Sequence, residues 1–157
     1  MSAKPIIPCL WFDNQAEEAA NFYTSIFKNS VIEHISRYVK EGYEHHGQQE
    51  GSVMTVSFKI NGQSFLALNG GPIFKFNEAI SFQVFCDTQV EIDYYWDRLT
   101  ENGEEVQCGW LKDKYGVSWQ IIPTVLSDLL GDPERTGRVT TAFMQMKKLD
   151  IEKLLKA

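Results

Sequence analysis

Three cysteines are the strongest candidate nucleophiles in this sequence: Cys9, Cys86 and Cys108. They are odd in number, lie far apart and form no CxxC pair, a pattern typical of reduced thiols packed as small hydrophobic side chains in a cytosolic protein. A catalytic thiol also needs a base that forms the thiolate, and no histidine stands at a spacing that indicates such a pair. The sequence therefore favours structural thiols and leaves any catalytic residue unknown.

Metal-ligating side chains are equally sparse. His45 and His46 are adjacent, so their side chains point apart in an extended chain, and we interpret the polar segment 40–52 around them as a solvated loop. The paired carboxylates Glu17-Glu18 and Glu104-Glu105 are typical of solvated helix starts and turns. The residues thus give no reason to expect a metal centre at these places.

Motifs that bind phosphates or activate a serine are missing. Residues 12–15, Phe-Asp-Asn-Gln, occupy the junction where a nucleotide-type cofactor needs a glycine-rich turn, and neither a P-loop nor a GxSxG elbow is present. We therefore expect no cofactor.

Charge and hydropathy exclude two classes of partner. The formal charge is −6, from 15 basic and 21 acidic residues, and no basic cluster interrupts this balance, so neither nucleic acid nor an anionic membrane is expected as a partner. No window approaches the roughly 20 apolar residues of a membrane span. Residues 1–12 also lack the charged start and long apolar stretch of a signal peptide, which predicts a cytoplasmic location.

Strand and helix signals occur twice in the same order. The first copy has strands expected at 6–12, 31–39, 53–60 and 63–69, with a helix from a cap at Asn14 to Lys28-Asn29 and a hairpin turn at Asn61-Gly62. The second copy has strands expected at 80–86, 106–111 and 117–122, with a helix from a Thr88-x-x-Glu91 capping box to Asn102-Gly103 and a turn at 113–116. A shift of 73 residues superposes the caps, aromatic pairs and ends of the two helices.

The sequence after this repeat indicates short helices. Residues 125–130 carry an apolar stripe, Asp132-Pro133 is typical of a helix start, and Asp150 is a candidate cap for a last turn. These stripes favour packing or a dimer contact over a cofactor site. The predicted fold class is α+β, with module one at about 5–70, module two at about 78–123 and a helical tail at 124–157, all within a single domain spanning 1–157.

Several long strings resemble one family. They are PCLWFDNQAEEAANFYTSIF (8–27), FKFNEAISFQVFCDTQ (74–89), IDYYWDRLTENGEEVQCGWLKDKYGVSWQIIP (92–123) and FMQMKKLDIEKL (143–154). The sequence is similar to the PhnB-like branch of the vicinal oxygen chelate superfamily, which includes glyoxalases, bleomycin-resistance proteins and extradiol dioxygenases. The resemblance implies two βαβββ modules whose curved mixed sheets surround a cavity, often in a homodimer. Many such sequences carry the label 3-demethylubiquinone-9 3-methyltransferase.

The resemblance also implies four metal-ligand positions, one on each of four strands. By strand position they correspond to Cys9, Ala67, Ser81 and Gln120. Alanine has no donor atom, and serine and glutamine are weak neutral ligands for a divalent ion. We therefore expect a metal-free protein.

Strand alternation then predicts the lining of the implied cavity. Residues two apart share a face, which groups Gln120 with Ser118, Ser81 with Gln83, Ala67 with Phe65 and Asn69, and Cys9 with Trp11. The ligand-binding residues expected from this are Trp11, Phe65, Asn69, Ser81, Gln83 and Gln120. Such an aromatic and amide lining suits a small, largely uncharged organic ligand.

Two alternatives stay open. Gln83 and Gln120 contact the ligand, or they hydrogen-bond to each other or to backbone and fill the cavity. The expected function is metal-free binding of a small molecule. The alternatives are an enzyme of the same superfamily (a lyase, a dioxygenase or, by label only, a ubiquinone-pathway methyltransferase) and a dimeric scaffold with a filled cavity.

Overall fold

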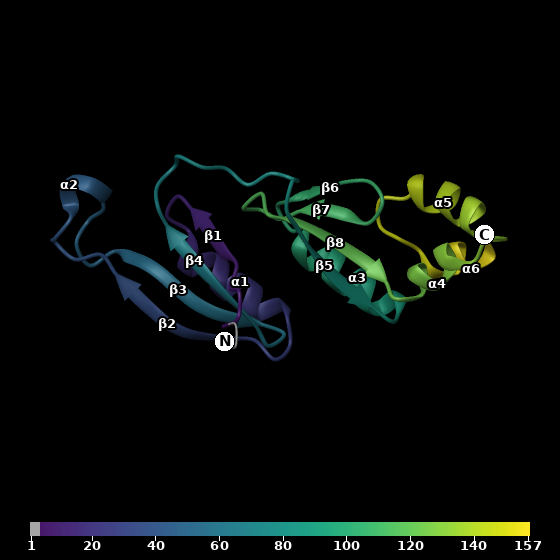
Figure 1. Cartoon of the computed structure of the whole chain (residues 1–157), viewed down its shortest axis with the longest axis horizontal. Coiled ribbons are helices and arrows are strands. Elements are labelled where there is room, and N and C mark those ends of the chain that lie inside the picture. The colour runs from purple at the N-terminus through teal and green to yellow at the C-terminus, as the bar shows by residue number, and fades with distance from the viewer. Residues whose placement is uncertain (1–3) are drawn as a thin grey trace. The chain divides into compact units, whose positions relative to one another are not determined.

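The computed structural model describes residues 4–157, and the chain divides into two compact units, one ending at Lys75 and the other beginning at Phe76 (Figure 1). The first unit contains β1 (Cys9–Phe12), α1 (Ala16–Ile26), β2 (Val31–Arg37), α2 (Tyr43–His46), β3 (Val53–Ile60) and β4 (Gln63–Asn69). The second contains β5 (Ser81–Cys86), α3 (Gln89–Leu99), β6 (Glu104–Glu105), β7 (Trp110–Lys112), β8 (Ser118–Pro123), α4 (Val125–Gly131), α5 (Thr136–Met144) and α6 (Ile151–Lys156).

Each unit is built on an open four-stranded mixed sheet, and the two sheets have the same topology. The strand orders are β1-β4-β3-β2 and β5-β8-β7-β6. In both, the first strand pairs in parallel with the last, and the other pairs are antiparallel. The α+β class and the duplicated βαβββ module are therefore confirmed. That residues 1–157 act as a single domain stays a prediction.

Helix α1 covers one face of the first sheet because small and aromatic residues follow one side of the helix. Ala16, Ala19, Ala20, Tyr23 and Ile26 are all buried. The Tyr23 ring stacks on Phe58 of β3, with ring centroids 6.2 Å apart, so Phe58 and its strand neighbours two residues away face the helix. We call this side the helix face of the sheet and the opposite side its open face.

Helix α3 covers one face of the second sheet in the same way. Ile92, Trp96 and Leu99 of the helix are buried, as are Leu111 of β7 and Trp119 and Ile121 of β8. Alternation along β8 therefore puts Ser118, Gln120 and Ile122 on the open face of this sheet. The grouping of Ser118 with Gln120 is as the sequence predicts, and Trp119 packs on the helix side.

Three predicted turns and caps are confirmed. Asn61 and Gly62 have φ angles of 47° and 80°, as a type I′ hairpin turn requires. Thr88 and Glu91 form the capping box of α3. Asp113 closes the 113–116 turn by accepting hydrogen bonds from the backbone N–H groups of Tyr115 and Val117 at 2.9 and 3.1 Å.

Three local expectations are corrected. The start of α1 is capped by Asn69 of β4, whose Oδ1 accepts from the Ala16 N–H at 2.8 Å, and not by Asn14. The loop 40–52 contains the short helix α2. Of the strand expected at 106–111, only Trp110 and Leu111 are extended, as the start of β7, because Cys108 and Gly109 have φ angles of 61° and 82° and make a turn between β6 and β7.

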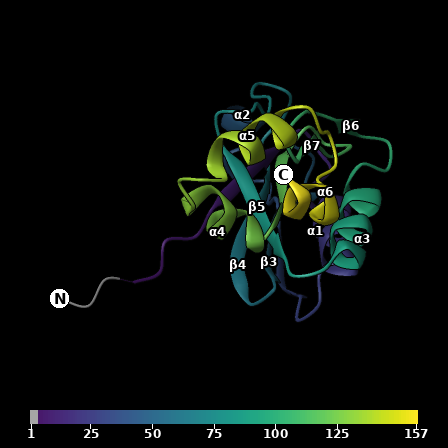
Figure 2. The same ribbon diagram turned by 90° about the vertical axis from the view of Figure 1, so that its right-hand side faces the viewer.

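The three helices of the tail pack on one another (Figure 2). Leu129, Val139, Leu149 and Leu154 form their shared core. Asp150 caps α6 through the Lys153 N–H at 3.0 Å, as predicted. Every helix that residues 4–157 contain is too short or too polar to cross a lipid bilayer.

Candidate functional site

The open face of the second sheet carries its polar and apolar side chains in three rows across neighbouring strands. Strand register aligns Ser81, Ser118 and Lys112 in the first row, which we call the polar row. It aligns Gln83, Gln120 and Trp110 in the second, the amide row, and Phe85 with Ile122 in the third, the apolar row. Adjacent rows are two residues apart, so they are separated by about 6.6 Å along the strands.

Gln120 connects the polar row to the amide row by two side-chain hydrogen bonds. Its Nε2 donates to Ser81 Oγ at 2.7 Å, and its Oε1 accepts from Gln83 Nε2 at 3.3 Å. The sequence left open whether Gln83 and Gln120 contact a ligand or bond to each other, and the structure shows that they are hydrogen-bonded to each other. Gln83 is exposed, so its remaining amide groups face solvent.

The apolar side chains of this face are also accessible. Phe85 is 60% exposed, and Trp110 and Ile122 are half-buried. The open face therefore combines neutral hydrogen-bonding groups with aromatic and aliphatic surface on adjoining rows. This is the combination found in sites for small organic ligands.

Trp11 lies on the open face of the first sheet and is held in place by the segment after β4. Its Nε1 donates to the Gly71 carbonyl at 2.8 Å, and its ring meets Phe74 edge-on, with centroids 5.0 Å apart. A Cβ on Gly70 would meet the indole ring at 2.1 Å, so this position has room only for glycine. Nearby on the first unit, a pocket of about 240 Å³ is lined in part by Cys9, Ser57 and Leu66.

Phe65 and Asn69, expected on the same side as Trp11, lie on the helix face. Phe65 stacks on Phe58 at 5.6 Å and is buried. The Asn69 side chain is committed to the Ala16 N–H and to the Val53 carbonyl. Register explains the difference, because β1 pairs with β4 so that Leu66 and Leu68, not Phe65 and Asn69, are the neighbours of Cys9 and Trp11.

The donors at the positions implied for a metal do not fit a divalent ion. Ala67 lies on the helix face and has no donor, and Leu66, its open-face neighbour, has none either. Ser81 and Gln120 offer only neutral oxygens, and each oxygen already accepts a hydrogen bond, Ser81 Oγ from Gln120 Nε2 and Gln120 Oε1 from Gln83 Nε2. Across residues 4–157, no three side chains of His, Cys, Asp or Glu are placed to hold one metal ion.

Two of the three thiols, Cys9 and Cys86, are in surroundings that disfavour nucleophilic chemistry. Burial, with added repulsion from Glu91 and Asp87, raises the pKa of Cys86 to about 12. Partial burial also raises the pKa of Cys9. Both shifts favour the protonated thiol, which is the unreactive form.

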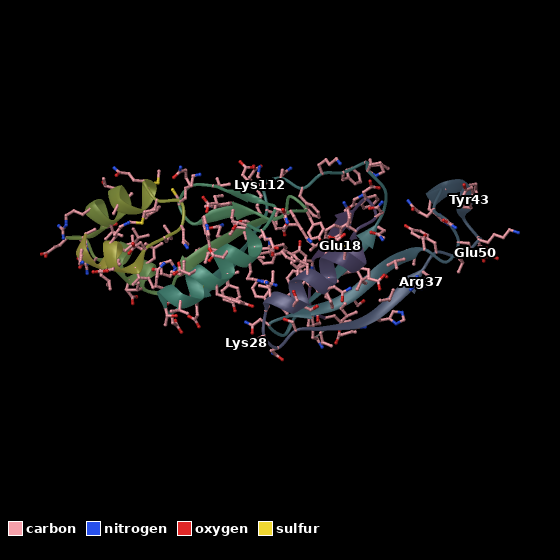
Figure 3. The ribbon with its side chains drawn as sticks, turned by 180° about the vertical axis from the view of Figure 1, so that it is seen from behind. Glu18, Lys28, Arg37, Tyr43, Glu50 and Lys112 are labelled. Carbon is pink, nitrogen blue, oxygen red and sulfur yellow. The ribbon has the colours of Figure 1, made fainter. Side chains whose placement is uncertain are left out.

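His46 is built into the local structure of the 40–52 segment, whereas the His45 side chain is exposed. The His46 ring packs against Tyr38, with centroids 4.6 Å apart, and its Nδ1 accepts from the Gln48 N–H at 3.0 Å. Figure 3 labels Tyr43 and Glu50 in this part of the chain, which lies between β2 and β3.

Three residues of the open face were not singled out from the sequence. Alternation groups Ser118 with Gln120 but assigns it no role, and no local sequence pattern fixes the orientation of Trp110. Lys112 follows from the same alternation two residues beyond Trp110. Only the register of β7 on β8 brings these three side chains beside the predicted ones.

Comparisons with known proteins agree on family and fold. The profile of the family described as 3-demethylubiquinone-9 3-methyltransferase matches residues 4–122. No curated protein matches the chain significantly. The solved structure of a PhnB protein from Bacillus cereus is 38% identical, with a TM-score of 0.68, and the match covers 77% of this chain and 100% of that one.

More distant structures share the fold alone. A protein from Pseudomonas aeruginosa is 16% identical with a TM-score of 0.60, over 77% of this chain and 98% of that one. The fosfomycin resistance protein FosX from Listeria monocytogenes, in complex with Mn(II) and sulfate, is 17% identical with a TM-score of 0.52, over 83% and 98%. From the profile match and the Bacillus relative, this chain belongs to the PhnB-like family, described as 3-demethylubiquinone-9 3-methyltransferase, of the vicinal oxygen chelate superfamily.

Proposed function

We propose that this protein binds a small, uncharged organic molecule on the open face of the second sheet, without a metal ion in that site. The observation that supports this most directly is the hydrogen-bonded chain from Gln83 through Gln120 to Ser81, beside exposed aromatic surface. Neutral amides and hydroxyls that both donate and accept are suited to polar groups without charge. Phe85, Ile122 and Trp110 supply the apolar contact area.

The proposed contacts of the ligand are Ser81, Gln83 and Gln120, with Trp110 as the aromatic neighbour. Phe65 and Asn69 are left out because their side chains belong to the helix face of the first unit. Trp11, on the open face of the first unit, stays a prediction. The expected homodimer and cytoplasmic location also stay predictions.

Methyl transfer, which the family description names, is not part of the proposal. The junction from β1 to α1 contains Asp13, Asn14 and Gln15, where a nucleotide-type methyl donor needs glycine for close approach. Metal-assisted chemistry, for which the FosX complex with Mn(II) is a precedent on this fold, would need stronger ligands than Ser81 and Gln120.

A thermal-shift screen of uncharged aromatic compounds against protein treated with a chelator tests the proposal. We expect at least one compound to raise the melting temperature of the wild type and of Gln63→Ala, a control on an exposed glutamine of β4. The same compound should raise that of Gln120→Ala much less. If no compound stabilises the wild type while Gln120→Ala lowers its melting temperature, the amides are internal filling and the scaffold alternative holds.

A further inference from the structure

The hydroxyl of Ser118 is buried on the open face of the second sheet without a hydrogen-bond partner. The residue is 2% exposed, and among residues 4–157 its Oγ is the buried side-chain polar atom that lacks a partner. An unpaired hydroxyl in such a place is unfavourable, because it has lost water and gained nothing in exchange. Ser118 lies directly beside Ser81 in the polar row, so the groups of this row define the chemistry of a ligand atom that could be the missing partner.

The polar row presents hydrogen-bond donors to one side of the sheet. Ser81 Oγ already accepts from Gln120 Nε2, so the Ser81 hydroxyl hydrogen remains to be donated. The Ser118 hydroxyl is equally available, and Lys112 on the next strand carries only donors. A single acceptor atom over this row can therefore accept from both hydroxyls, whereas a donor atom would leave the Ser81 hydroxyl hydrogen unpaired.

An ion pair spans the strand that carries Ser118, on the side where Ser118 lies. The Lys112 ammonium, labelled in Figure 3, pairs with the carboxylate of Glu78, three residues before Ser81. Strand β8 lies between β7 and β5, and Lys112 is level with Ser118, so a contact from Lys112 to the segment before β5 passes over the start of β8, next to Ser118. Both partners are partly exposed, and exposed ion pairs contribute little free energy, so this cover opens at small cost.

The charges around the polar row select an uncharged acceptor. Lys112 is shared by two carboxylates, because Glu104 of β6 also lies 3.9 Å from its Nζ. One positive and two negative groups give the row a net charge of about −1, which disfavours an anionic ligand. A cation over the row would lie beside the Lys112 ammonium and the hydroxyl hydrogens of Ser81 and Ser118, and their positive charge disfavours it.

We propose that the Ser81 and Ser118 hydroxyls form a two-donor subsite for an uncharged carbonyl oxygen of the ligand, covered in this structure by the Lys112–Glu78 ion pair. The inference rests on the proposed function and names the ligand class for that site. The rest of the ligand extends over the amide row to Trp110, about 6.6 Å farther along the strands. A carbonyl group two or three bonds from an aromatic ring fits this spacing.

Three matched probes test the chemistry of the oxygen: 4-phenylbutan-2-one, 3-phenylpropanoate and 4-phenylbutan-2-amine in its ammonium form. Their affinities are measured by titration of the backbone amide NMR signals of Ser81, Gln83 and Gln120. We expect the ketone to bind several-fold more tightly than either charged probe. Tighter binding of the carboxylate or of the ammonium overturns the proposal.

Three substitutions test the residues. Ser118→Ala removes an unpaired hydroxyl, so its melting temperature should equal or exceed that of the wild type, while its ketone affinity falls about tenfold. Glu78→Gln weakens the cover and should raise ketone affinity several-fold, whereas Ser57→Ala, on the first unit, should change nothing. Unchanged ketone affinity in Ser118→Ala, or unchanged or weaker affinity in Glu78→Gln, contradicts the subsite.

The same experiments separate a wrong serine subsite from a wrong proposed function. If the ketone shifts the signals of Gln83 and Gln120 but Ser118→Ala binds it as well as the wild type, the ligand site stands and the serine subsite falls. If none of the three probes shifts any signal on the open face, both fall.

Discussion

Gln120 donates from Nε2 to Ser81 Oγ at 2.7 Å while its Oε1 accepts from Gln83, so one amide joins two parallel strands through their side chains. Gln120→Ala removes both bonds, and because the groups are only partly buried we expect a loss of about 1–2 kcal/mol in the free energy of unfolding. Urea denaturation measures it. Gln63→Ala should stay within about 0.5 kcal/mol of the wild type. Equal losses of stability in Gln120→Ala and Gln63→Ala would show that the hydrogen bonds of Gln120 to Ser81 and Gln83 do not stabilise the fold.

Asn69 is predicted to stabilise the first unit through its cap on α1. Asn69→Ala leaves the Ala16 N–H and the Val53 carbonyl without their partner, which we expect to cost about 2–3 kcal/mol in the free energy of unfolding. Asn14→Ala, at the cap position suggested by the sequence alone, should cost less than about 0.5 kcal/mol. Chemical denaturation of both variants decides between the two caps, and a larger loss in Asn14→Ala would reverse the assignment.

Cys86 should resist alkylation in the native protein. Its raised pKa of about 12 keeps the thiol protonated, and since only the thiolate reacts, the fraction available stays small even at pH 10. Mass spectrometry after treatment with N-ethylmaleimide at pH 8 should find the exposed Cys9 modified faster than the buried Cys86. In urea all three cysteines should react. If Cys86 of the native protein reacts as fast as Cys9, its thiol is not held in the protonated form and is again a candidate nucleophile.

Divalent metals should bind the protein weakly and without defined stoichiometry. Ser81 and Gln120 are neutral oxygen ligands, which hold Mn²⁺, Ni²⁺ or Zn²⁺ poorly compared with histidine and carboxylate. Calorimetric titration of chelator-treated protein tests this. The double substitution Ser81→His and Gln120→Glu places two strong ligands at the same positions and should increase Zn²⁺ affinity. Tight binding of one equivalent by the wild type would exclude the metal-free proposal.

The sequence correctly predicts those turns and caps that are formed by residues close together in the chain. The Asn61-Gly62 turn, the Thr88–Glu91 capping box and the Asp113 turn each depend on residues close in the chain, and all three are confirmed. Strand alternation groups Gln120 with Ser118 and Ser81 with Gln83, and both groupings agree with the register of β5 on β8.

The parts that sequence reasoning did not reach depend on contacts between distant residues. Strand β4 is apolar on both faces, with Phe65 on one side and Leu66 and Leu68 on the other, so its pattern does not say which side meets the helix. The cap of α1 comes from Asn69, 53 residues beyond Ala16. No local pattern contains such a partner.

The most direct test of the central claim, that neutral groups on the open face of the second sheet bind an uncharged organic molecule without a metal, is an amide NMR titration. Chelator-treated protein is titrated with 4-phenylbutan-2-one, and then with the same ketone after Zn²⁺ is added. The account predicts saturable shifts at Ser81, Gln83, Trp110 and Gln120 that are the same with and without Zn²⁺. Shifts that are confined to other residues, or that occur only when the metal is present, would contradict it.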